Sequence, residues 1–464
     1  MMPACTLTLS EAIHARLLLH LFPGDGKEAA AVLVCTKVPG ERLRLLTRNL
    51  ILVPHAECSR RDENSLTWSS DHIELAIDIA EPQQLSIILV HSHPTGFPEF
   101  STVDDRSDRQ IIPSIFEACG HLHGTAVMLP TGVMFGRVYT QELVIAPIDL
   151  ISVVGIDQCY WWAKDLHRPV GRPMAFASAM SNELSRLTAC VIGVSGTGSI
   201  VAEQLCRLGF GRVILIDHDN VERKNLNRIL NTIKADADEE RPKVDAFAER
   251  VNAYREIPYA IAVNANALTR EAVVAAAQAD VLFSCVDTHR GRSVADRIAA
   301  AFLLPLVDVG VAIPTRNIGR EKAIDEATCR IDYVYPGGSS LFDRGVYTGA
   351  TLQGEALAEA DPDAHCEQVK RGYIEDFPEQ APSVITLNMR ASSAVVMEFI
   401  ARAYPFRHES NSLYARTRFM LAEGVEEFSA ESDFKSRVSP DLARGDQEPL
   451  LNLPVLAEIA GGKR

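Results

Sequence analysis

The stretch CVIGVSGTGSIVAEQLCRLGFGRVILIDHD, residues 190–219, decides the fold of the larger part of the chain. It holds, in order, an apolar run, a glycine-rich turn, a helix-like segment and a second apolar run that ends in Asp217. Buried strands joined through such a turn and helix are typical of a doubly wound parallel sheet. Two further apolar runs, 279–287 and 304–311, add strands to the same sheet. We therefore predict a Rossmann-like α/β domain.

The residues before about 150 have a different texture. Short aliphatic or β-branched runs bounded by Gly, Pro and Asp alternate with one or two helices, which predicts an α+β domain with a mixed sheet. Residues 155–184 are rich in Gly, Pro and polar side chains, so the boundary between the two domains is expected there. The predicted organisation is an N-terminal domain over 1–150, a linker over 151–183, a second domain over 184–404 and a C-terminal extension over 405–464.

The composition excludes several classes of function. The net charge of −15 argues against a nucleic-acid surface as the main partner, because phosphate binding needs clustered Lys and Arg. The ten cysteines include no C-x-x-C pair, which favours a reduced protein with neither a disulfide framework nor a Cys-based zinc site. There is no signal peptide and no apolar run long enough for a bilayer, so we expect a soluble, cytoplasmic protein with no membrane partner.

The strongest local motif is IILVHSHPTGFPEFSTVDD, residues 87–105. His91 and His93 stand two positions apart at the end of an apolar strand, so both rings project from one face, about 7 Å apart at Cα. Asp104 follows in the first turn of the next helix and can supply an oxygen ligand. Two His and one carboxylate, with a fourth position left for water, are typical of catalytic zinc. Ser101 and Asp104 also fit an ordinary helix-capping pattern.

This segment resembles the JAMM (MPN-type) metalloprotease motif, His-x-His-x7-Ser-x2-Asp, with every spacing met. The resemblance implies a zinc ion held by the two histidines and Asp104, with Ser101 donating to the developing oxyanion. It also implies an upstream Glu as proton shuttle. Glu28 precedes a suitable strand, with Glu11 and Glu41 as alternatives. Enzymes of this family cleave peptide or isopeptide bonds after the tail of ubiquitin-like proteins, which is the substrate class implied here.

The glycine-rich turn of the second domain predicts a nucleotide site. Gly193, Gly196 and Gly198 lie between a strand and a helix, where backbone amides approach phosphates closely. Asp217, at the end of the next strand, is expected to accept hydrogen bonds from ribose hydroxyls. An NAD-binding Rossmann domain is the alternative owner of such a turn, but its usual glycines fall at i, i+2 and i+5, and i+2 here is Ser195.

The residues after this turn form an ordered set that resembles the ThiF, MoeB and ubiquitin-activating enzyme family over about residues 187–404. The family pattern is G-x-G-G-x-G, then D-x-D-x-V-x-x-x-N-L-x-R, a Lys, and an Asp after the fourth strand; Ser195 replaces one Gly. The resemblance implies adenylation of a protein C-terminus with ATP and Mg²⁺. Arg228 and Lys243 would neutralise the phosphates, Asn225 would orient them, and Asp287 would hold Mg²⁺. The predicted nucleotide-binding residues are Gly193, Gly196, Gly198, Asp217, Asp219, Asn225, Arg228, Lys243 and Asp287.

The family resemblance also raises the question of a transfer cysteine. Residues 337–382 are Gly-rich and acidic without clear periodicity, and we expect a long crossover loop there. Cys366 in this segment is the first candidate for the acceptor thiol, and Cys329 is the second. The resemblance further implies a homodimer through this domain, with an arginine from the partner subunit at the site. Arg172 is a weak candidate for that arginine.

Together the two domains suggest opposing chemistries on one ubiquitin-like protein. The first domain would trim or deconjugate the modifier, and the second would activate its C-terminus and pass it to a conjugating-enzyme-like partner. Such fusions are similar to those of bacterial ubiquitination-like operons, some linked to antiphage defence. One alternative is processing and activation of a sulfur carrier for thiolation of a cofactor or metabolite. Another is an NAD-binding or catalytically dead adaptor, against which the intact motifs argue.

Overall fold

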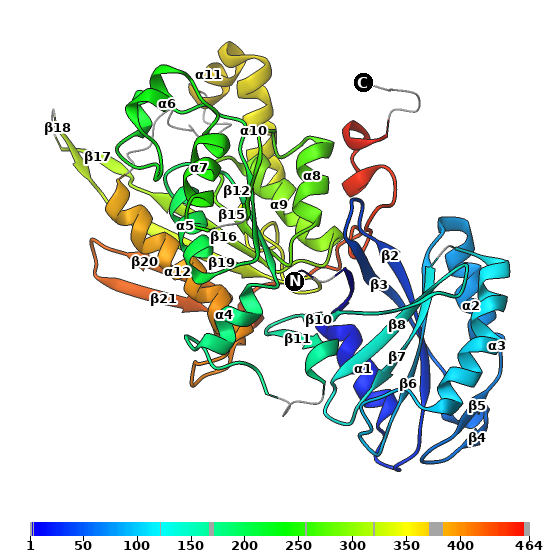
Figure 1. Ribbon diagram of the computed structural model, residues 1–464. Coiled ribbons are helices and arrows are strands. Elements are labelled where there is room, and N and C mark those ends of the chain that lie inside the picture. Colours follow the sequence, from blue (N-terminus) through cyan, green and yellow to red (C-terminus); the bar gives the residue numbers. More distant parts are fainter. Residues whose placement is uncertain are drawn as a thin grey trace. The chain divides into compact units, whose positions relative to one another are not determined.

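The computed structural model describes residues 2, 4–120, 122–166, 171–255, 258–318, 321–370 and 384–458. The chain forms two compact units, each built on its own sheet (Figure 1). The N-terminal unit comprises Pro3–Arg172, Ala301–Leu303 and Asp441–Arg464. The central unit comprises Met1–Met2, Pro173–Ala300 and Leu304–Pro440.

A nine-stranded mixed sheet forms the N-terminal unit, in the order β11-β10-β1-β3-β2-β6-β7-β8-β9. Alternate side chains of the central strand β2 face opposite layers: Leu33 packs in the cluster that contains Leu17 of helix α1, and Val32 in the cluster that contains Ile112 of helix α3. The sheet is therefore covered by α1 on one face and by α2 and α3 on the other (Figure 1). The elements are β1 Cys5–Ser10, α1 Glu11–Leu21, β2 Ala30–Lys37, β3 Leu43–Leu52, β4 Cys58–Arg61, β5 Leu66–Trp68, α2 Asp71–Ala80, β6 Ser86–Ser92, α3 Thr102–Ala118, β7 Leu122–Met128, β8 Met134–Thr140, β9 Ile145–Pro147, β10 Leu150–Val154 and β11 Gln158–Trp162.

The sheet of the central unit has the order β14-β13-β12-β15-β16-β19-β20-β21. The first five strands are parallel and the last three antiparallel, so the predicted doubly wound fold is confirmed. The strand order reverses direction at β12, and in such sheets the ligand crevice lies outside the carboxyl ends of the strands at that point. The elements are α4 Ser178–Leu184, β12 Thr188–Ile192, α5 Gly198–Leu208, β13 Arg212–Ile216, α6 Lys234–Asp238, α7 Lys243–Asn252, β14 Ala260–Val263, α8 Arg270–Ala277, β15 Val281–Ser284, α9 His289–Ala301, β16 Leu306–Ala312, β17 Thr315–Ile318, β18 Glu321–Ile324, β19 Thr328–Val334, α10 Gly349–Ala360, α11 Pro362–Lys370, α12 Ile385–Ala403, β20 Arg416–Met420 and β21 Val425–Ser429.

The prediction of a linker over 151–183 is wrong for residues 151–162, which form strands. Strand β10, Leu150–Val154, pairs in parallel with β1. Strand β11, Gln158–Trp162, pairs antiparallel with β10, so both segments extend the first sheet. All five residues of β10 are buried, and this short apolar run is stabilised as a strand beside β1. The glycine and polar residues that suggested a linker form the turn between the two strands and the segment after them.

The C-terminal extension expected over 405–464 is also divided. Its first part supplies β20 and β21 to the edge of the central sheet. Its last part belongs to the N-terminal unit, where the Thr36 hydroxyl donates to the carbonyl of Ala443 over 2.9 Å and the Asp446 amide donates to Lys37 over 2.8 Å. Leu450 and Leu451 are fully buried there. The first part of this segment therefore belongs to the central unit, and its last part belongs to the N-terminal unit.

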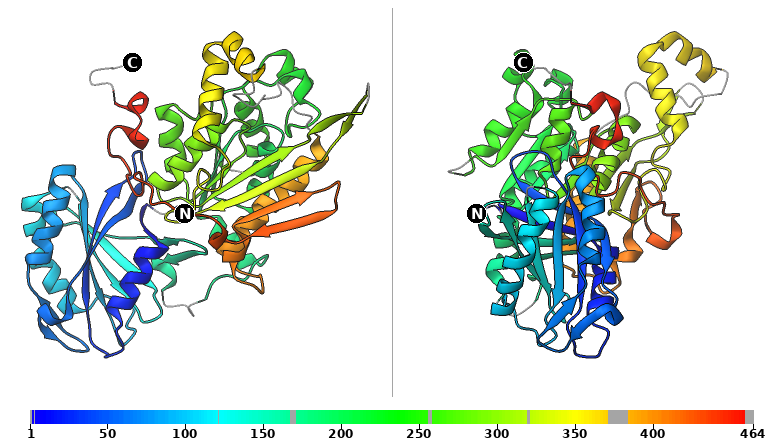
Figure 2. Two further views of the ribbon diagram at one scale, coloured as in Figure 1. Left: turned by 180° about the vertical axis from the view of Figure 1, so that it is seen from behind. Right: turned by 90° about the vertical axis from the view of Figure 1, so that its right-hand side faces the viewer.

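The long crossover loop expected over 337–382 contains two helices. Figures 1 and 2 show α10 and α11 as a helical hairpin of the central unit. Thr348 caps α10 by accepting a hydrogen bond from the amide of Thr351. Residues 371–382 of the predicted loop lie outside the described residues. Among the helices that the structure describes, none is both long enough and apolar enough to span a bilayer.

Candidate metal and nucleotide sites

Strand β6 brings the two histidines of the H-S-H motif together. His91 lies opposite Ala30 of β2, and His93 follows the strand end, where its amide donates to the carbonyl of Met128. The two Nε2 atoms are 3.1 Å apart. The Nδ1 atom of His93 lies 2.9 Å from the carbonyl oxygen of Phe97, and a hydrogen bond there leaves Nε2 as the ligand atom.

Asp104 completes this cluster and also caps its own helix. One carboxylate oxygen lies 3.1 Å from His91 Nε2, and the other lies 3.6 Å from His93 Nε2. The second oxygen also accepts from the amide of Ser101 over 2.6 Å, and the Ser101 hydroxyl accepts from the amide of Asp104. The capping pattern and the metal-ligand pattern are therefore both present. Burial alone would raise the pKa of Asp104, but hydrogen bonds from the two histidines hold it well below its usual range.

The three side chains fit a zinc ion by geometry and by chemistry. In tetrahedral coordination with metal–ligand bonds near 2.0–2.1 Å, two ligand atoms lie about 3.3–3.4 Å apart. The observed separations of 3.1, 3.1 and 3.6 Å match that edge. One ligand atom from each of the three side chains lies within 4.8 Å of the other two, which is close enough for all three to hold one metal ion. Two imidazoles and one carboxylate form a donor set that zinc takes at catalytic sites.

Glu28 is the acidic residue that faces this cluster. It precedes β2, and its neighbour Ala29 exchanges hydrogen bonds with Ser92, between the two histidines. Burial raises the pKa of Glu28, and the charges of His91 and His93 partly oppose that shift. The two alternatives lie elsewhere. Glu11 accepts from the amide of Ile156 at the start of α1, and Glu41 is exposed in the turn before β3.

The glycine turn lies where the Rossmann crevice is expected, at the carboxyl end of β12. Gly193 has φ +86°, which favours glycine, and a Cβ at Gly198 would collide with the carbonyl oxygen of Gly193. A Cβ at Gly196 would lie 2.6 Å from Asn388 Nδ2 and 3.1 Å from Arg228 Cδ. The absence of side chains therefore lets α5 begin directly against the strand, with the Arg228 side chain packed over the turn.

The Asp217 carboxylate, which is expected to accept from ribose hydroxyls, also accepts hydrogen bonds from the main chain. Its two carboxylate oxygens accept from the amides of Val194 and Asp219, over 2.7 and 2.9 Å, and the residue is 8% exposed. Burial raises its pKa, which Lys243 partly opposes. The carboxylate thus holds the glycine turn against the loop after β13, because main-chain amides in loops need acceptors that a buried carboxylate can provide.

Asp219 is the more accessible acid of this loop and is paired with the predicted lysine. Lys243 Nζ lies 2.6 Å from the Asp219 carboxylate, and the lysine is buried. Burial opposes ionisation of Asp219, but the bond from Lys243 keeps its pKa below the usual range. Asn225 is buried, and its side-chain oxygen accepts from the amide of Glu222, which fixes the orientation of the side-chain amide.

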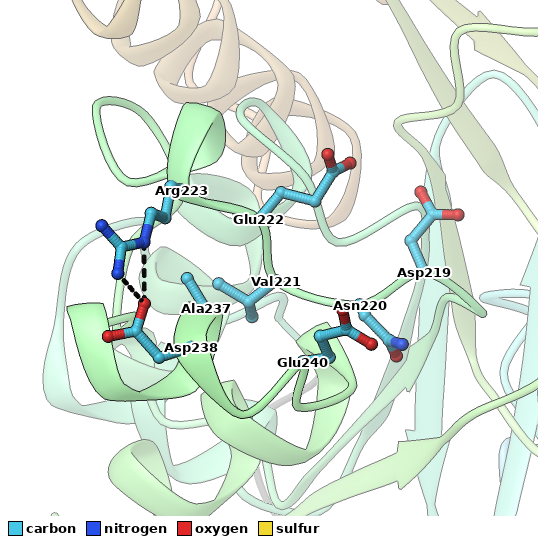
Figure 3. Close-up of a pocket in the computed structure, with 8 residues that line it drawn as sticks. All are labelled: Asp219, Asn220, Val221, Glu222, Arg223, Ala237, Asp238 and Glu240. Carbon is cyan, nitrogen blue, oxygen red and sulfur yellow. Dashed lines mark hydrogen bonds and ion pairs between the residues drawn. The ribbon is translucent and has the colours of Figure 1, made fainter.

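A pocket of about 670 Å³ has Asp219 among the residues that line it (Figure 3). In Figure 3, the Arg223–Asp238 ion pair lies at one side of the pocket and Asp219 at the other. Glu222 and Glu240 also line it. This acidic lining repels phosphates, so the pocket does not suit a triphosphate. The amides of the glycine turn and the two cations beside it suit phosphates better.

Asp287 lies beyond the end of β15, next to the glycine turn. The amide of Cys285 donates to the carbonyl of Ile192 over 2.8 Å, which joins the two loops. The Asp287 side chain is exposed, and its carbonyl accepts from Arg292 over 3.3 Å. The predicted nucleotide residues therefore gather at the carboxyl ends of the neighbouring strands β12, β13 and β15.

Family models match both units. Residues 171–373 match the ThiF family, and residues 10–146 match the prokaryotic homologs of the JAB domain. The chain is a fusion of a JAB domain and a ThiF domain. The JAB match falls within the N-terminal unit and includes the His91–His93–Asp104 cluster, and the ThiF match includes the whole glycine-turn site.

Curated relatives are similar to parts of the chain. A stretch of 86 residues, 18% of this chain and 33% of the relative, is 36% identical to the tRNA threonylcarbamoyladenosine dehydratase of Bacillus subtilis (strain 168). A stretch of 192 residues, 38% of this chain and 42% of the relative, is 29% identical to ubiquitin-like modifier-activating enzyme 5 of Caenorhabditis elegans. The chain thus spans less than half the length of these relatives. A crystal structure of E. coli MccB with ATP aligns with TM-score 0.42 and 15% identity over 57% of this chain and 68% of that chain.

The two candidate cysteines of the ThiF part differ sharply in accessibility. Cys366 is exposed on α11. Cys329 is fully buried in β19, and burial raises its pKa to about 12. Since a thiolate is the attacking species, Cys329 is unsuited to act as the acceptor thiol.

Glu355 is a site residue that the sequence did not indicate. On α10, its two carboxylate oxygens accept from the amides of His289 and Arg290 at the start of α9, over 2.7 and 2.8 Å. Arg290 also pairs with Glu359 of α10. The α10–α11 hairpin, which carries Cys366, is thereby attached to the segment that follows Asp287. An acidic residue within a helix gives no local sequence signal for such a cap.

The histidine–aspartate cluster predicts that the stability of the metal-free protein depends on pH. Although burial lowers the pKa of His93, bonds to Asp104 and Phe97 raise it above its ordinary value of 6.5. A raised histidine pKa stabilises the fold below pH 6.5, and this stabilisation is lost as pH rises through the folded pKa. With a chelator present, we expect the unfolding temperature of the N-terminal unit to fall by about 2–4 °C between pH 6 and pH 8, measured by calorimetry.

The zinc-loaded protein should not show that fall, because zinc binds neutral imidazole and binds better as protons leave. His93→Gln should flatten the metal-free profile. Equal profiles with and without zinc would contradict the assignment of this cluster as a metal site.

Proposed function

We propose that the ThiF part adenylates the C-terminal carboxylate of a ubiquitin-like protein with ATP, and that the JAB part cleaves the peptide or isopeptide bond that follows the same tail. The observation that carries the proposal is the presence, in one chain, of the His91–His93–Asp104 cluster and of a glycine turn surrounded by the residues of the activating-enzyme pattern. The matches to the ThiF family and to ubiquitin-like modifier-activating enzyme 5 support ATP-dependent adenylation of a small protein modifier.

In the adenylation step, a carboxylate oxygen of the modifier attacks the α-phosphorus of ATP, and the bond to pyrophosphate breaks. The residues around the glycine turn contribute by position and charge. Turn amides at the start of α5 receive phosphate oxygens, and Arg228 and Lys243 offset their charge. Asp217 would accept from the ribose hydroxyls through lone pairs that its two amide bonds leave free, and the more exposed Asp219 offers a second carboxylate. Asp287 would hold Mg²⁺, which supplies further positive charge to the phosphates.

In the cleavage step, Glu28 takes a proton from the attacking water and returns it to the leaving amine. Its half-buried position and raised pKa suit this exchange, since a carboxyl with a pKa nearer neutrality can both accept and donate a proton. Zinc held by His91, His93 and Asp104 would supply a Lewis acid for the water and the carbonyl. The Ser101 hydroxyl accepts from Asp104, so its own hydrogen can be donated to the developing oxyanion.

After adenylation, Cys366 would attack the acyl-adenylate, forming a thioester and releasing AMP. Its exposure on α11 supports this role, and the Glu355 cap holds the hairpin beside the Asp287 segment. A conjugating-enzyme-like protein would receive the modifier, and the ThiF part would form a homodimer. The second candidate function is activation of a sulfur carrier, in which an external sulfur nucleophile replaces Cys366. Under the first function, the fusion suits a bacterial ubiquitination-like pathway such as one used in antiphage defence.

The first experiment separates zinc binding from proton transfer. Glu28→Gln should retain about one zinc per chain, because Glu28 is not a ligand. It should cleave the cognate modifier, extended past its C-terminus, at least about 100-fold more slowly than wild type. Glu41→Gln is the matched control and should cleave at the normal rate. Loss of cleavage in the control but not in Glu28→Gln would show that Glu28 is the wrong shuttle.

The second experiment tests adenylation. With the cognate modifier, wild type should exchange labelled pyrophosphate into ATP, and Asp287→Asn should lower the exchange rate by about 100-fold or more through loss of the Mg²⁺ carboxylate. Glu239→Gln, at the end of α6, should exchange normally. Tight NAD binding without pyrophosphate exchange would instead favour the NAD-binding alternative.

The third experiment asks where the acyl group goes. Wild type with ATP and modifier should form a thiol-sensitive adduct with the mass of enzyme plus modifier. Cys366→Ala should keep pyrophosphate exchange and lose the adduct, and Cys366→Ser should trap an oxygen ester that resists thiols. An adduct that persists in Cys366→Ala and is lost in Cys329→Ala would contradict the assignment. Unchanged turnover in both variants would favour the sulfur-carrier function.

A further inference from the structure

We propose that Arg137, on β8, is a positioning residue for the zinc site, because it fixes the helix start that carries Asp104 and Ser101. The inference rests on the proposed zinc site and adds a residue outside the JAMM motif. Arg137 contacts none of the three ligands. Its side chain is 11% exposed and forms ion pairs with two residues of α3, Asp105 and Asp108.

The guanidinium of Arg137 holds the first two turns of α3 at two points. Nη1 donates to Asp105 over 2.6 Å, and Nη2 and Nε donate to Asp108 over 2.7 and 3.1 Å. Asp105 follows the ligand Asp104 directly, and Asp108 lies one turn further along the same face as Asp104. One planar group bonded to both residues fixes the rotation of the helix about its axis and its position along the sheet.

The same guanidinium also holds the residue before the helix. Its central carbon lies 3.9 Å from the centroid of the Phe100 ring. Phe100 precedes Ser101 and packs edge-on against Phe135, with ring centroids 5.2 Å apart, and Phe135 in turn contacts the His93 ring. Arg137 therefore contacts the residue before the Ser101–Asp104 capping pair, Phe100, and the residue after it, Asp105.

Only an arginine can make this set of contacts. The planar fork has donors on separate nitrogens, so it reaches two carboxylates and stacks on an aromatic ring at once, whereas a lysine offers a single ammonium. Asp108 is buried and receives two further hydrogen bonds, from the hydroxyls of Thr125 and Tyr139. These bonds hold the Asp108 carboxylate in the core, so Asp108 is the more firmly held of the two carboxylates that Arg137 binds. Asp105, with 43% of its side chain exposed, is the one nearer the metal.

The test uses the full chain, stripped of metal and titrated with zinc against a chromophoric chelator. Asp105→Asn removes the ion pair between Arg137 and the residue next to Asp104, and it leaves the buried Asp108 unchanged. We expect its zinc affinity to fall by about 10-fold, the lower end of the effect of residues that orient metal ligands. The unfolding temperature of the metal-free protein should stay within about 1 °C of wild type, because an exposed ion pair contributes little stability.

Arg137→Lys separates geometry from charge. It retains the positive charge, so a purely electrostatic effect would leave zinc affinity unchanged, whereas loss of the fork should weaken zinc binding by about 10-fold or more. Tyr139→Phe is the matched control: it removes one donor to Asp108 but leaves both carboxylates that Arg137 binds. It should lower the unfolding temperature while keeping zinc affinity within about 2-fold of wild type.

Wild-type zinc affinity in both Asp105→Asn and Arg137→Lys would overturn the inference and leave Arg137 as a tether of the core. An equal loss of affinity in Tyr139→Phe would also overturn it, since stability alone would then explain the effect. Absence of zinc binding by the wild type is a separate result that would overturn the proposed zinc site itself.

Discussion

Carboxylates that accept hydrogen bonds from main-chain amides hold the functional loops of both units. The amides in question are left without partners where a strand ends or a helix begins, and a carboxylate removed from water needs donors of its own. Each satisfies the other. The pairs are Asp104 with Ser101, Asp217 with Val194 and Asp219, and Glu355 with His289 and Arg290. The loops are thus set in place before any substrate or ion arrives, which reduces the ordering that binding requires.

This constraint also divides the acids into two groups with different roles. Asp217 accepts from two main-chain amides, whereas Asp219 is paired with Lys243 and is more exposed. Asp104 combines both roles, because one oxygen accepts from an amide while the carboxylate as a whole faces two histidines. A residue that both caps a helix and binds an ion couples the position of the ion to the direction of that helix. The direction of α3 in turn depends on what packs against its first two turns.

Local patterns were enough to predict the parallel sheet and the two clusters. The apolar runs that became β12, β13 and β15 are almost entirely buried, so each carries a continuous apolar signal that is typical of a strand in a parallel sheet. The spacing of His91, His93 and Asp104 works in the same way, because strand and helix geometry alone bring them together. Where the outcome depends on distant partners, the sequence could not predict it. Strand β10 looked like a linker because its partner β1 lies about 145 positions earlier. The hydrogen bonds from two amides to Asp217 could not be predicted either, because these partners become apparent only in the folded loop.

Because the N-terminal unit is completed by residues from Asp441 onward, its assembly is coupled to the order of synthesis. A ribosome produces the central unit in full before it produces the segment that packs against β2 and buries Leu450 and Leu451. The N-terminal unit therefore reaches its final core only after the central unit has been translated. A chain truncated during synthesis before Asp441 would therefore carry an N-terminal unit with an incomplete core, even where the whole central unit had been made.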